Sequence, residues 1–324
     1  MDKKIGPLRA ALRGVIDLFG RTLNIGELGP EDRIDGLNCL ITGANKGLGK
    51  AIAIELARRG GSVHMVGRTM DEKARAEIAQ KSENPSIEMH HCDLAKLNNI
   101  HRLTHEFQKS RITFQIVVLN AGIVHLKPMP TKSGLDEMFV VNYLANFLLV
   151  DNLLRHCIIA PKAEGTYSPI PRIVLVSSET HRWITDVDFE TIGRYKPVTI
   201  KHIMSLYARD KFCLTTWGME LSRRLSSNKR IEVAVHAHCP GAVRSQIARE
   251  APPWIKPLLW LLFRFFQSPS KACKPALYLS CAKAIEGQTG IYLHLMKQKQ
   301  VDARAKDPIV AKKLWDASER LLPP

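Results

Sequence analysis

Short apolar segments alternate with longer amphipathic segments along most of the chain, beginning at residue 37. Segments in which almost every residue is apolar predict strands buried on both faces, and apolar residues at helical spacing predict helices. The predicted strands are CLITGA (39–44), SVHMVG (62–67), IEMHHC (87–92), QIVVLN (115–120), RIVLVSS (172–178) and IEVAVHAHC (231–239). The predicted helices cover 48–59, 71–83, 96–109, 133–157 and 201–226. This alternation predicts an α/β fold, a doubly wound parallel sheet with helices on both faces.

The pattern changes at both ends of this region. Residues 1–36 place apolar residues at helical spacing among lysines and arginines, which is typical of a helix on a membrane surface, and end in a polar linker. We therefore predict an N-terminal amphipathic helix and linker over 1–36, one domain over 37–300 and a helical C-terminal extension over 301–324. The strongly apolar segment 252–266 predicts a lid over about 247–270, a dimer contact or a membrane contact. No segment has the roughly 18 uninterrupted apolar residues of a membrane-spanning helix.

Composition and net charge narrow the classes of partner that the protein can bind. The 324 residues are 45% hydrophobic and 24% charged, which is typical of a globular protein with a large core. A net charge of +16 fits a polyphosphate cofactor or an anionic membrane surface. We expect no nucleic-acid partner, because the basic residues are scattered and form no stripe with aromatic residues. Seven dispersed cysteines without a CxxC pair favour a reduced, intracellular protein.

Histidines gather at two places without predicting a metal site. His90, His91 and Cys92 are adjacent, and His101 and His105 are one helical turn apart. Neither group has a third and fourth ligand at a recognisable spacing, so we predict no metal ion.

A glycine-rich turn, TGANKGLG, follows the first predicted strand. Its glycines would allow a tight turn, an open approach to backbone N–H groups and close packing of the next helix on the strand. Such a turn at a helix start is typical of a pyrophosphate site, and it predicts a dinucleotide cofactor. The predicted contacts in the turn are Gly43, Asn45, Lys46, Gly47, Leu48 and Gly49.

The end of the second strand is expected to lie beside the adenosine ribose, where an acidic residue would select NAD(H). The chain has Arg68 there instead, and Lys46 lies in the glycine turn. Two cations favour the 2′-phosphate of NADP(H), with NAD(H) as the alternative. Further cofactor contacts are predicted after the third strand, for the adenine, and after the fourth, for the ribose: Asp93, Leu94, Asn120, Ala121 and Gly122.

Tyr207 and Lys211 lie one turn apart on a predicted helix and therefore share a face. The tyrosine hydroxyl can pass a proton to a carbonyl oxygen, and the lysine can stabilise its anionic form. Ser177 and Ser178 end the fifth strand, where a hydroxyl can bind the same substrate oxygen. Asn142, on the long predicted helix, can order a water beneath the lysine and complete a proton relay.

The chain resembles the short-chain dehydrogenase/reductase family over residues 37–295. The resemblance rests on an ordered set: TGANKGLG, Asp93, the NAG sequence at 120–122, Asn142, Ser178, the Tyr207/Lys211 pair and Pro240-Gly241. It implies a Rossmann-type fold, an NAD(P)-dependent oxidoreductase and a homodimer. Tyr207 would be the catalytic acid/base and Ser178 its partner. Lys211 would bind the nicotinamide ribose and lower the pKa of the tyrosine, and Asn142 would hold the relay water.

The same resemblance extends to the segment PGAVRS, which is similar to the part of that family that contacts the nicotinamide carboxamide. It adds Pro240, Gly241, Val243 and Ser245 to the implied cofactor contacts. Lys46 matches the basic residue that members preferring NADP carry in the glycine turn.

Within the family, three segments (AIAIELARRGGSVHMVGR, RIVLVSSETHR and AKKLWDASERLL) are similar to the retinol dehydrogenase-like reductases. This resemblance implies NADP(H) chemistry on a retinoid, a steroid or a lipid aldehyde or ketone, often at a membrane. Arg209 and Asp210 depart from the small residues usual before the active lysine. We expect Asp210 to point away from the site, because neighbouring helix residues diverge by about 100°.

The sequence thus predicts an NADP(H)-dependent oxidoreductase that transfers a hydride to or from an apolar carbonyl or alcohol. Two alternatives remain: an NAD-dependent steroid-type dehydrogenase and a non-catalytic, cofactor-binding sensor or scaffold. The charge and the amphipathic segments also suggest a membrane-surface module, but they fit an enzyme that rests on its substrate's membrane equally well. The expected location is intracellular, either cytoplasmic or peripherally attached to a membrane.

Overall fold

The computed structural model describes residues 25–159, 169–184, 186–227, 230–243 and 266–322. The predicted N-terminal amphipathic helix, most of the predicted lid, and Ser245 lie outside the described residues.

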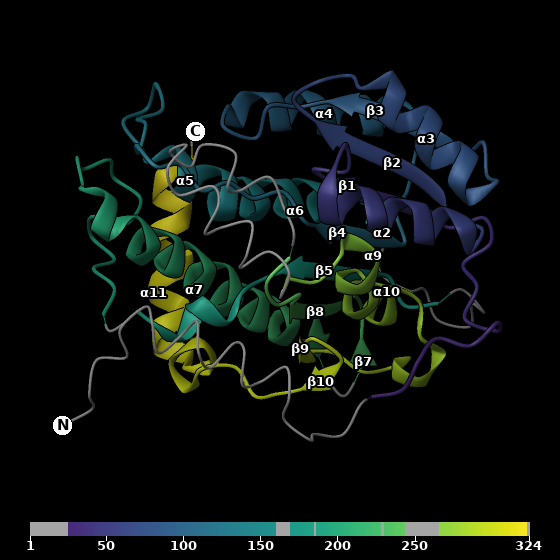
Figure 1. Cartoon of the computed structure of the whole chain (residues 1–324). Coiled ribbons are helices and arrows are strands. Elements are labelled where there is room, and N and C mark those ends of the chain that lie inside the picture. Colours follow the sequence, from purple (N-terminus) through teal and green to yellow (C-terminus); the bar gives the residue numbers. More distant parts are fainter. Residues whose placement is uncertain (1–24, 160–168, 185, 228–229, 244–265, 323–324) are drawn as a thin grey trace.

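An eight-stranded sheet forms the centre of the molecule (Figure 1). Its strands are β1 (Asn38–Thr42), β2 (Ser62–Gly67), β3 (Ile87–His91), β4 (Ile116–Leu119), β5 (Arg172–Val176), β8 (Ala234–Cys239), β9 (Tyr292–His294) and β10 (Lys297–Gln298). The order across the sheet is β10-β9-β8-β5-β4-β1-β2-β3, and all neighbours are parallel except β9 and β10. The predicted doubly wound parallel sheet is therefore confirmed.

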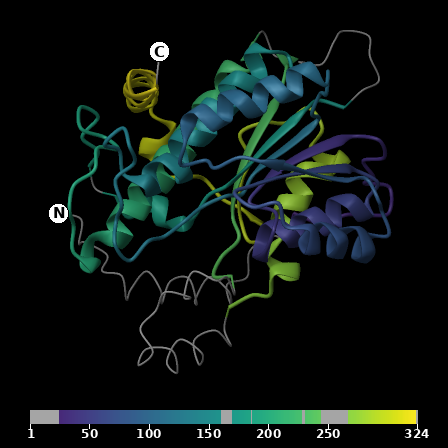
Figure 2. The same cartoon turned by 90° about the horizontal axis from the view of Figure 1, so that it is seen from above.

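Helices cover both faces of this sheet, as Figure 2 shows from above. The α-helices are α2 (Gly47–Arg58), α3 (Glu72–Ser82), α4 (Leu97–Lys109), α5 (Glu137–Phe139), α6 (Ala145–Arg155), α7 (Ile200–Arg224), α9 (Pro269–Ala272), α10 (Lys274–Cys281) and α11 (Pro308–Leu321). Shorter elements are the π-helical η1 (Val140–Leu144), the 3₁₀ turns η2 (Glu179–Arg182), η5 (Lys283–Ile285) and η6 (Ala303–Lys306), and the hairpin β6 (Ser226–Ser227)–β7 (Arg230–Ile231).

The apolar strands divide the core into two clusters because successive strand residues point to opposite faces. Leu40, Val117 and Leu175 belong to the cluster that contains residues of α4, α6 and α7. Ile41 and Val118 belong to the other cluster, which contains residues of α2, α3 and α10. Burial on both faces explains why these strands contain so few polar residues.

The strand order reverses at β1, which lies between β2 and β4. In a doubly wound sheet the connections on the two sides of such a point diverge and leave a crevice beyond the carboxyl ends of the strands. The loops after β1, β4 and β5, which carry the predicted site residues, all start at this edge of the sheet.

The structure differs from the predicted elements at the helix 133–157 and at elements that were not predicted, among them α9 and α10. The helix predicted over 133–157 is interrupted by η1, so that α5, η1 and α6 follow one another. The strands β9 and β10 and the β6–β7 hairpin were not predicted, because runs of two or three residues carry no detectable alternation.

Within the predicted C-terminal extension, α11 packs across α6 and α7 (Figure 1). The Tyr143 hydroxyl and the Ser318 hydroxyl are 2.6 Å apart and buried. The Trp315 ring lies 5.0 Å from the Phe147 ring and 3.7 Å from the guanidinium of Arg224. The extension thus covers aromatic side chains of the core.

One stretch among the described residues, Glu137–Arg155, is long and apolar enough to cross a membrane, with a mean hydropathy of 1.2. The protein interior buries 83% of it. This stretch is α5, η1 and α6, which pack against the sheet, so we assign it as a core helix.

Candidate active site

The glycine turn joins β1 to α2 and requires glycine at three positions. Gly43 and Gly47 have φ angles of +70° and +58°, which side chains other than glycine rarely adopt. A Cβ on Gly49 would stand 2.3 Å from the carbonyl oxygen of Gly43. The first turn of α2 contains no acidic residue, and Lys46 at its N-cap makes no capping hydrogen bond. The N–H groups at this helix start therefore fit a phosphate.

The turn is tied to the end of β2, where the adenosine ribose was predicted. The Asn45 amide donates hydrogen bonds to the Thr69 carbonyl (2.9 Å) and hydroxyl (3.1 Å). Lys46 and Arg68 are both exposed, and neither forms an ion pair with a described carboxylate. Both cations are therefore available to an anionic ligand. After β3, Asp93 accepts from the Ala95 N–H and lies 3.2 Å from the Lys96 amine, and Leu94 is buried.

The segment 120–122 connects the glycine turn to the predicted proton relay. The Asn120 amide donates to the carbonyls of Thr42 (2.9 Å) and Gly43 (3.1 Å), and the Thr42 hydroxyl accepts from the Ala121 N–H. At the other end of the segment, a Cβ on Gly122 would lie 3.3 Å from the Asn142 amide oxygen and 3.7 Å from the Lys211 amine. The cofactor turn and the relay residues thus belong to one continuous surface.

Tyr207 and Lys211 lie on α7 and face the end of β5. The Tyr207 hydroxyl lies near Ser178, which caps η2 directly after β5 and acts to lower the pKa of the tyrosine. The Lys211 amine donates to the Val176 carbonyl (2.8 Å) and lies 5.6 Å from the centre of the Tyr207 ring. Ser177 points elsewhere, and its hydroxyl is 2.6 Å from that of Thr215. The structure therefore brings Ser178, rather than Ser177, to the tyrosine.

Burial affects the ionisation of both Tyr207 and Lys211. Burial raises the pKa of Tyr207, and the nearby Asp210 adds to the rise, while Ser178 opposes it. Burial also lowers the pKa of Lys211 to about 8.

Asn142 lies in the π-helical turn η1, an irregularity that often occurs at functional sites. Its amide oxygen accepts from the Ile123 N–H (2.8 Å), and its amide nitrogen donates to the Ile123 carbonyl (3.0 Å). The same nitrogen donates to the Asp210 carboxylate (3.2 Å). The side chain thus bridges the 120–123 segment and α7.

Asp210 does not point away from the site, contrary to the expectation from the helix geometry. It is fully buried, and its carboxylate accepts from Asn142 and from Arg209 (2.7 Å). The Arg209 guanidinium also donates to the buried Asp136 (3.0 Å), which caps the start of α5. The guanidinium of Arg209 therefore forms ion pairs with two buried carboxylates, Asp136 and Asp210, next to the proposed relay. Sequence reasoning missed Asp136, because only the fold brings it to α7.

The loop after β8 contains the remaining predicted cofactor contacts. Pro240 and Gly241 follow the strand, and Gly241 has a φ angle of +74°. Val243 forms a bridge with Gln267. His238, at the end of β8, was not predicted to matter, but it is buried close enough to Lys211 for the lysine to lower its pKa, after burial, to about 3.

Comparisons with known proteins agree with this arrangement. Residues 38–182 match the sequence profile of the family described as short chain dehydrogenase. Retinol dehydrogenase 13 of Mus musculus is 33% identical over 300 residues, which cover 89% of this chain and 84% of that one. A solved structure from Mycobacterium Paratuberculosis superposes with a TM-score of 0.67 at 24% identity, over 91% of this chain and 97% of that chain. A putative short chain dehydrogenase from Shigella flexneri, solved with NADP, gives a TM-score of 0.60 at 20% identity, over 82% and 98%.

Proposed function

Because the chain belongs to the short-chain dehydrogenase family and its retinol dehydrogenase-like subgroup, and is thus an NAD(P)-dependent oxidoreductase acting on alcohols, we propose that it uses NADP(H) on an apolar substrate. The substrate class is a retinoid, a steroid or a lipid aldehyde or ketone. The observation that carries the proposal is the placement of Tyr207 near Ser178 and above Lys211, joined to the glycine turn through residues 120–122.

The proposed chemistry assigns each residue a separate task. Bound at the glycine turn, the nicotinamide dinucleotide supplies or accepts the hydride. Tyr207 donates its proton to the carbonyl oxygen that becomes the alcohol, and the Ser178 hydroxyl donates a hydrogen bond to the same oxygen. Lys211 holds the nicotinamide ribose. Asn142 supports this ribose site through its hydrogen bonds to the 120–123 segment.

Carbonyl reduction and alcohol oxidation need opposite protonation states of Tyr207. Burial keeps the pKa of the phenol above its ordinary value, so the hydroxyl retains its proton at neutral pH. Reduction needs a proton donor at this position, whereas oxidation needs the tyrosinate. We therefore propose that the protein acts as a carbonyl reductase when NADPH is plentiful.

A substrate panel tests this function. Purified protein is mixed with NADPH and, in turn, retinal, a medium-chain aldehyde, a steroid ketone and a small sugar aldehyde, and the loss of NADPH absorbance is followed. We expect turnover of the first three groups and none of the sugar. Absence of turnover across the panel with both NADPH and NADH would instead favour the non-catalytic sensor or scaffold.

Cofactor preference rests on Lys46 and Arg68. We propose that Arg68 contacts the 2′-phosphate, and we expect Arg68→Ala to weaken NADPH binding about ten-fold while leaving NADH binding unchanged, since a hydrogen bond to a charged group contributes roughly 1.5–3 kcal/mol and this site is exposed. Dissociation constants for both cofactors measure the effect. Arg75→Ala on α3, which removes an exposed arginine paired with Glu72, is the matched control. Wild-type protein that binds NADPH no tighter than NADH would end the 2′-phosphate proposal in favour of the NAD-dependent steroid-type alternative.

The proposal also covers the cellular location and the oligomeric state of the enzyme. An apolar substrate partitions into bilayers, and a net charge of +16 favours an anionic surface. We therefore propose peripheral attachment to an intracellular membrane, with a homodimer as the assembly. Co-sedimentation with anionic vesicles and sedimentation equilibrium measure the two features.

A further inference from the structure

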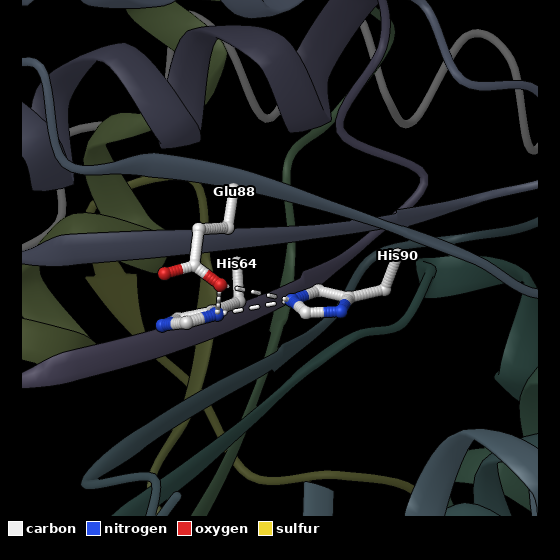
Figure 3. Close-up of side chains that lie close together, drawn as sticks. All are labelled: His64, Glu88 and His90. Atoms are coloured by element: carbon white, nitrogen blue, oxygen red, sulfur yellow. Dashed lines mark hydrogen bonds and ion pairs between the residues drawn. The ribbon is translucent and has the colours of Figure 1, made fainter. Parts of the chain in front are cut away.

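Three potential metal ligands meet on one face of the sheet, on strands that the sequence separates. His64 lies on β2, and Glu88 and His90 lie on the neighbouring β3. In the parallel register His64 is opposite Glu88, and Val66 is opposite His90. The side chains of all three residues therefore leave the sheet on the same side, and they point toward one another in Figure 3.

The separations of the three ligand atoms suit a transition-metal ion. The His64 Nδ1 and His90 Nε2 atoms are 3.0 Å apart, and Glu88 Oε2 lies 3.5 Å and 3.9 Å from them. These separations place the point equidistant from all three atoms about 2.0 Å from each, which is the length of a zinc–nitrogen or zinc–oxygen bond. Tetrahedral ligands at this bond length are roughly 3.3 Å apart, so the two nitrogens need to separate by only a few tenths of an ångström.

The chemistry of the three side chains is also compatible with a cation. Among the described residues, no lysine or arginine pairs with Glu88, whose carboxylate contacts two imidazoles. A neutral imidazole carries, on one ring nitrogen, the lone pair that a metal needs.

The surroundings hold the ligands in place and leave one side open. The Phe114 ring packs edge-on against His64 at 5.2 Å, and the Phe107 ring packs edge-on against His90 at 4.8 Å. These contacts fix the planes of both imidazoles. Glu88 is 67% exposed, so an ion can enter from solvent on its side, and water can occupy a fourth position.

We propose that His64, Glu88 and His90 form a binding site for a divalent transition metal, with Zn²⁺ as the preferred ion and water as the fourth ligand. The site joins the edge strand β3 to β2. Because β1 and β4 separate β2 from β5 in the sheet, it stands apart from Tyr207 and does not depend on the proposed function. Two imidazoles and one carboxylate favour zinc, cobalt or nickel over magnesium, which prefers oxygen ligands.

Calorimetric titration of the chelator-treated full chain with ZnCl₂ tests the site, with MgCl₂ as the ion control. Cys157, an exposed cysteine, is replaced by serine in all samples so that its thiol does not compete. We expect one zinc ion per chain, no binding of magnesium, and a rise in the melting temperature with zinc. Cobalt should give the visible absorption of a four-coordinate site.

Variants separate this site from adventitious binding. Glu88→Gln and His90→Gln should each weaken zinc binding at least ten-fold and abolish the zinc-dependent rise in melting temperature. Glu88 is exposed, so its substitution should not disturb folding. His91→Gln is the matched control, because His91 is the next residue on β3 and lies outside the cluster. Wild-type protein that binds no zinc, or Glu88→Gln and His90→Gln variants that bind it as tightly as His91→Gln, would overturn the proposal.

Discussion

Replacing Tyr207 with phenylalanine should lower kcat/KM for carbonyl reduction by about 10²- to 10⁴-fold, which is the usual contribution of a positioned general acid. The variant loses only the hydroxyl that lies near Ser178, while the ring keeps its place above Lys211. We therefore expect the dissociation constant for NADPH to stay unchanged. Steady-state rates, together with a separate cofactor titration, distinguish loss of chemistry from loss of binding.

The control for this prediction is Tyr195→Phe, which removes a partly buried phenol outside α7. It should retain the wild-type rate. A Tyr207→Phe enzyme that also retained this rate would contradict the assigned proton donor, even if the cofactor proposal survived.

Replacing Arg209 with methionine should lower the free energy of unfolding by about 3–5 kcal/mol, the usual cost of removing one partner from a buried ion pair. Arg209 lies 2.7 Å from Asp210 and 3.0 Å from Asp136, and both carboxylates are buried. Methionine fills a similar volume but leaves two negative charges without a partner. Urea unfolding at pH 7 measures the loss.

The loss should shrink as the pH falls. Burial already raises the pKa of Asp210 to about 6 in the wild type, although Arg209 opposes the rise. Without Arg209, the folded-state pKa of Asp210 rises further above its unfolded value. Protons then bind the folded state more tightly, so the stability lost above pH 6 returns as the pH is lowered toward about 4.

Two further variants test the explanation. Arg223→Met removes an exposed arginine on the same helix, paired with Glu220, and should cost less than about 1 kcal/mol. Combining Arg209→Met with Asp136→Asn and Asp210→Asn should recover much of the stability, because neutral amides need no countercharge. An Arg209→Met loss as small as that of Arg223→Met would show that the two carboxylates do not depend on Arg209.

The sequence was sufficient for the sheet because its strands are buried on both faces. The prediction for 62–67 coincides with β2, and those for 71–83 and 96–109 are within one residue of α3 and α4 at each end. The long helix 133–157 was only partly right. A π-helical turn shifts the register by one residue without changing which residues are apolar, so η1 left no trace in the hydrophobic pattern.

Contacts between segments that are distant in the chain could not be predicted from the sequence. Asp210 was expected to point away, but three consecutive residues of α7 from Arg209 to Lys211 are largely buried, because elements pack against several sides of this helix. Likewise, the histidine near His90 was missing from the sequence analysis, because the register that brings His64 to β3 forms only when the strands pair. Sequence motifs were enough to predict the individual site residues. The side chains that contact and support them became apparent only in the folded structure.

The packing of helix α11 has a consequence for truncated forms of this protein. Its side chains cover Tyr143, Phe147 and Arg224, which lie on the elements that hold the proposed relay. A truncation before residue 308 removes α11 and exposes the rings of Tyr143 and Phe147 to water. We expect a protein without α11 to expose apolar surface and to aggregate more readily.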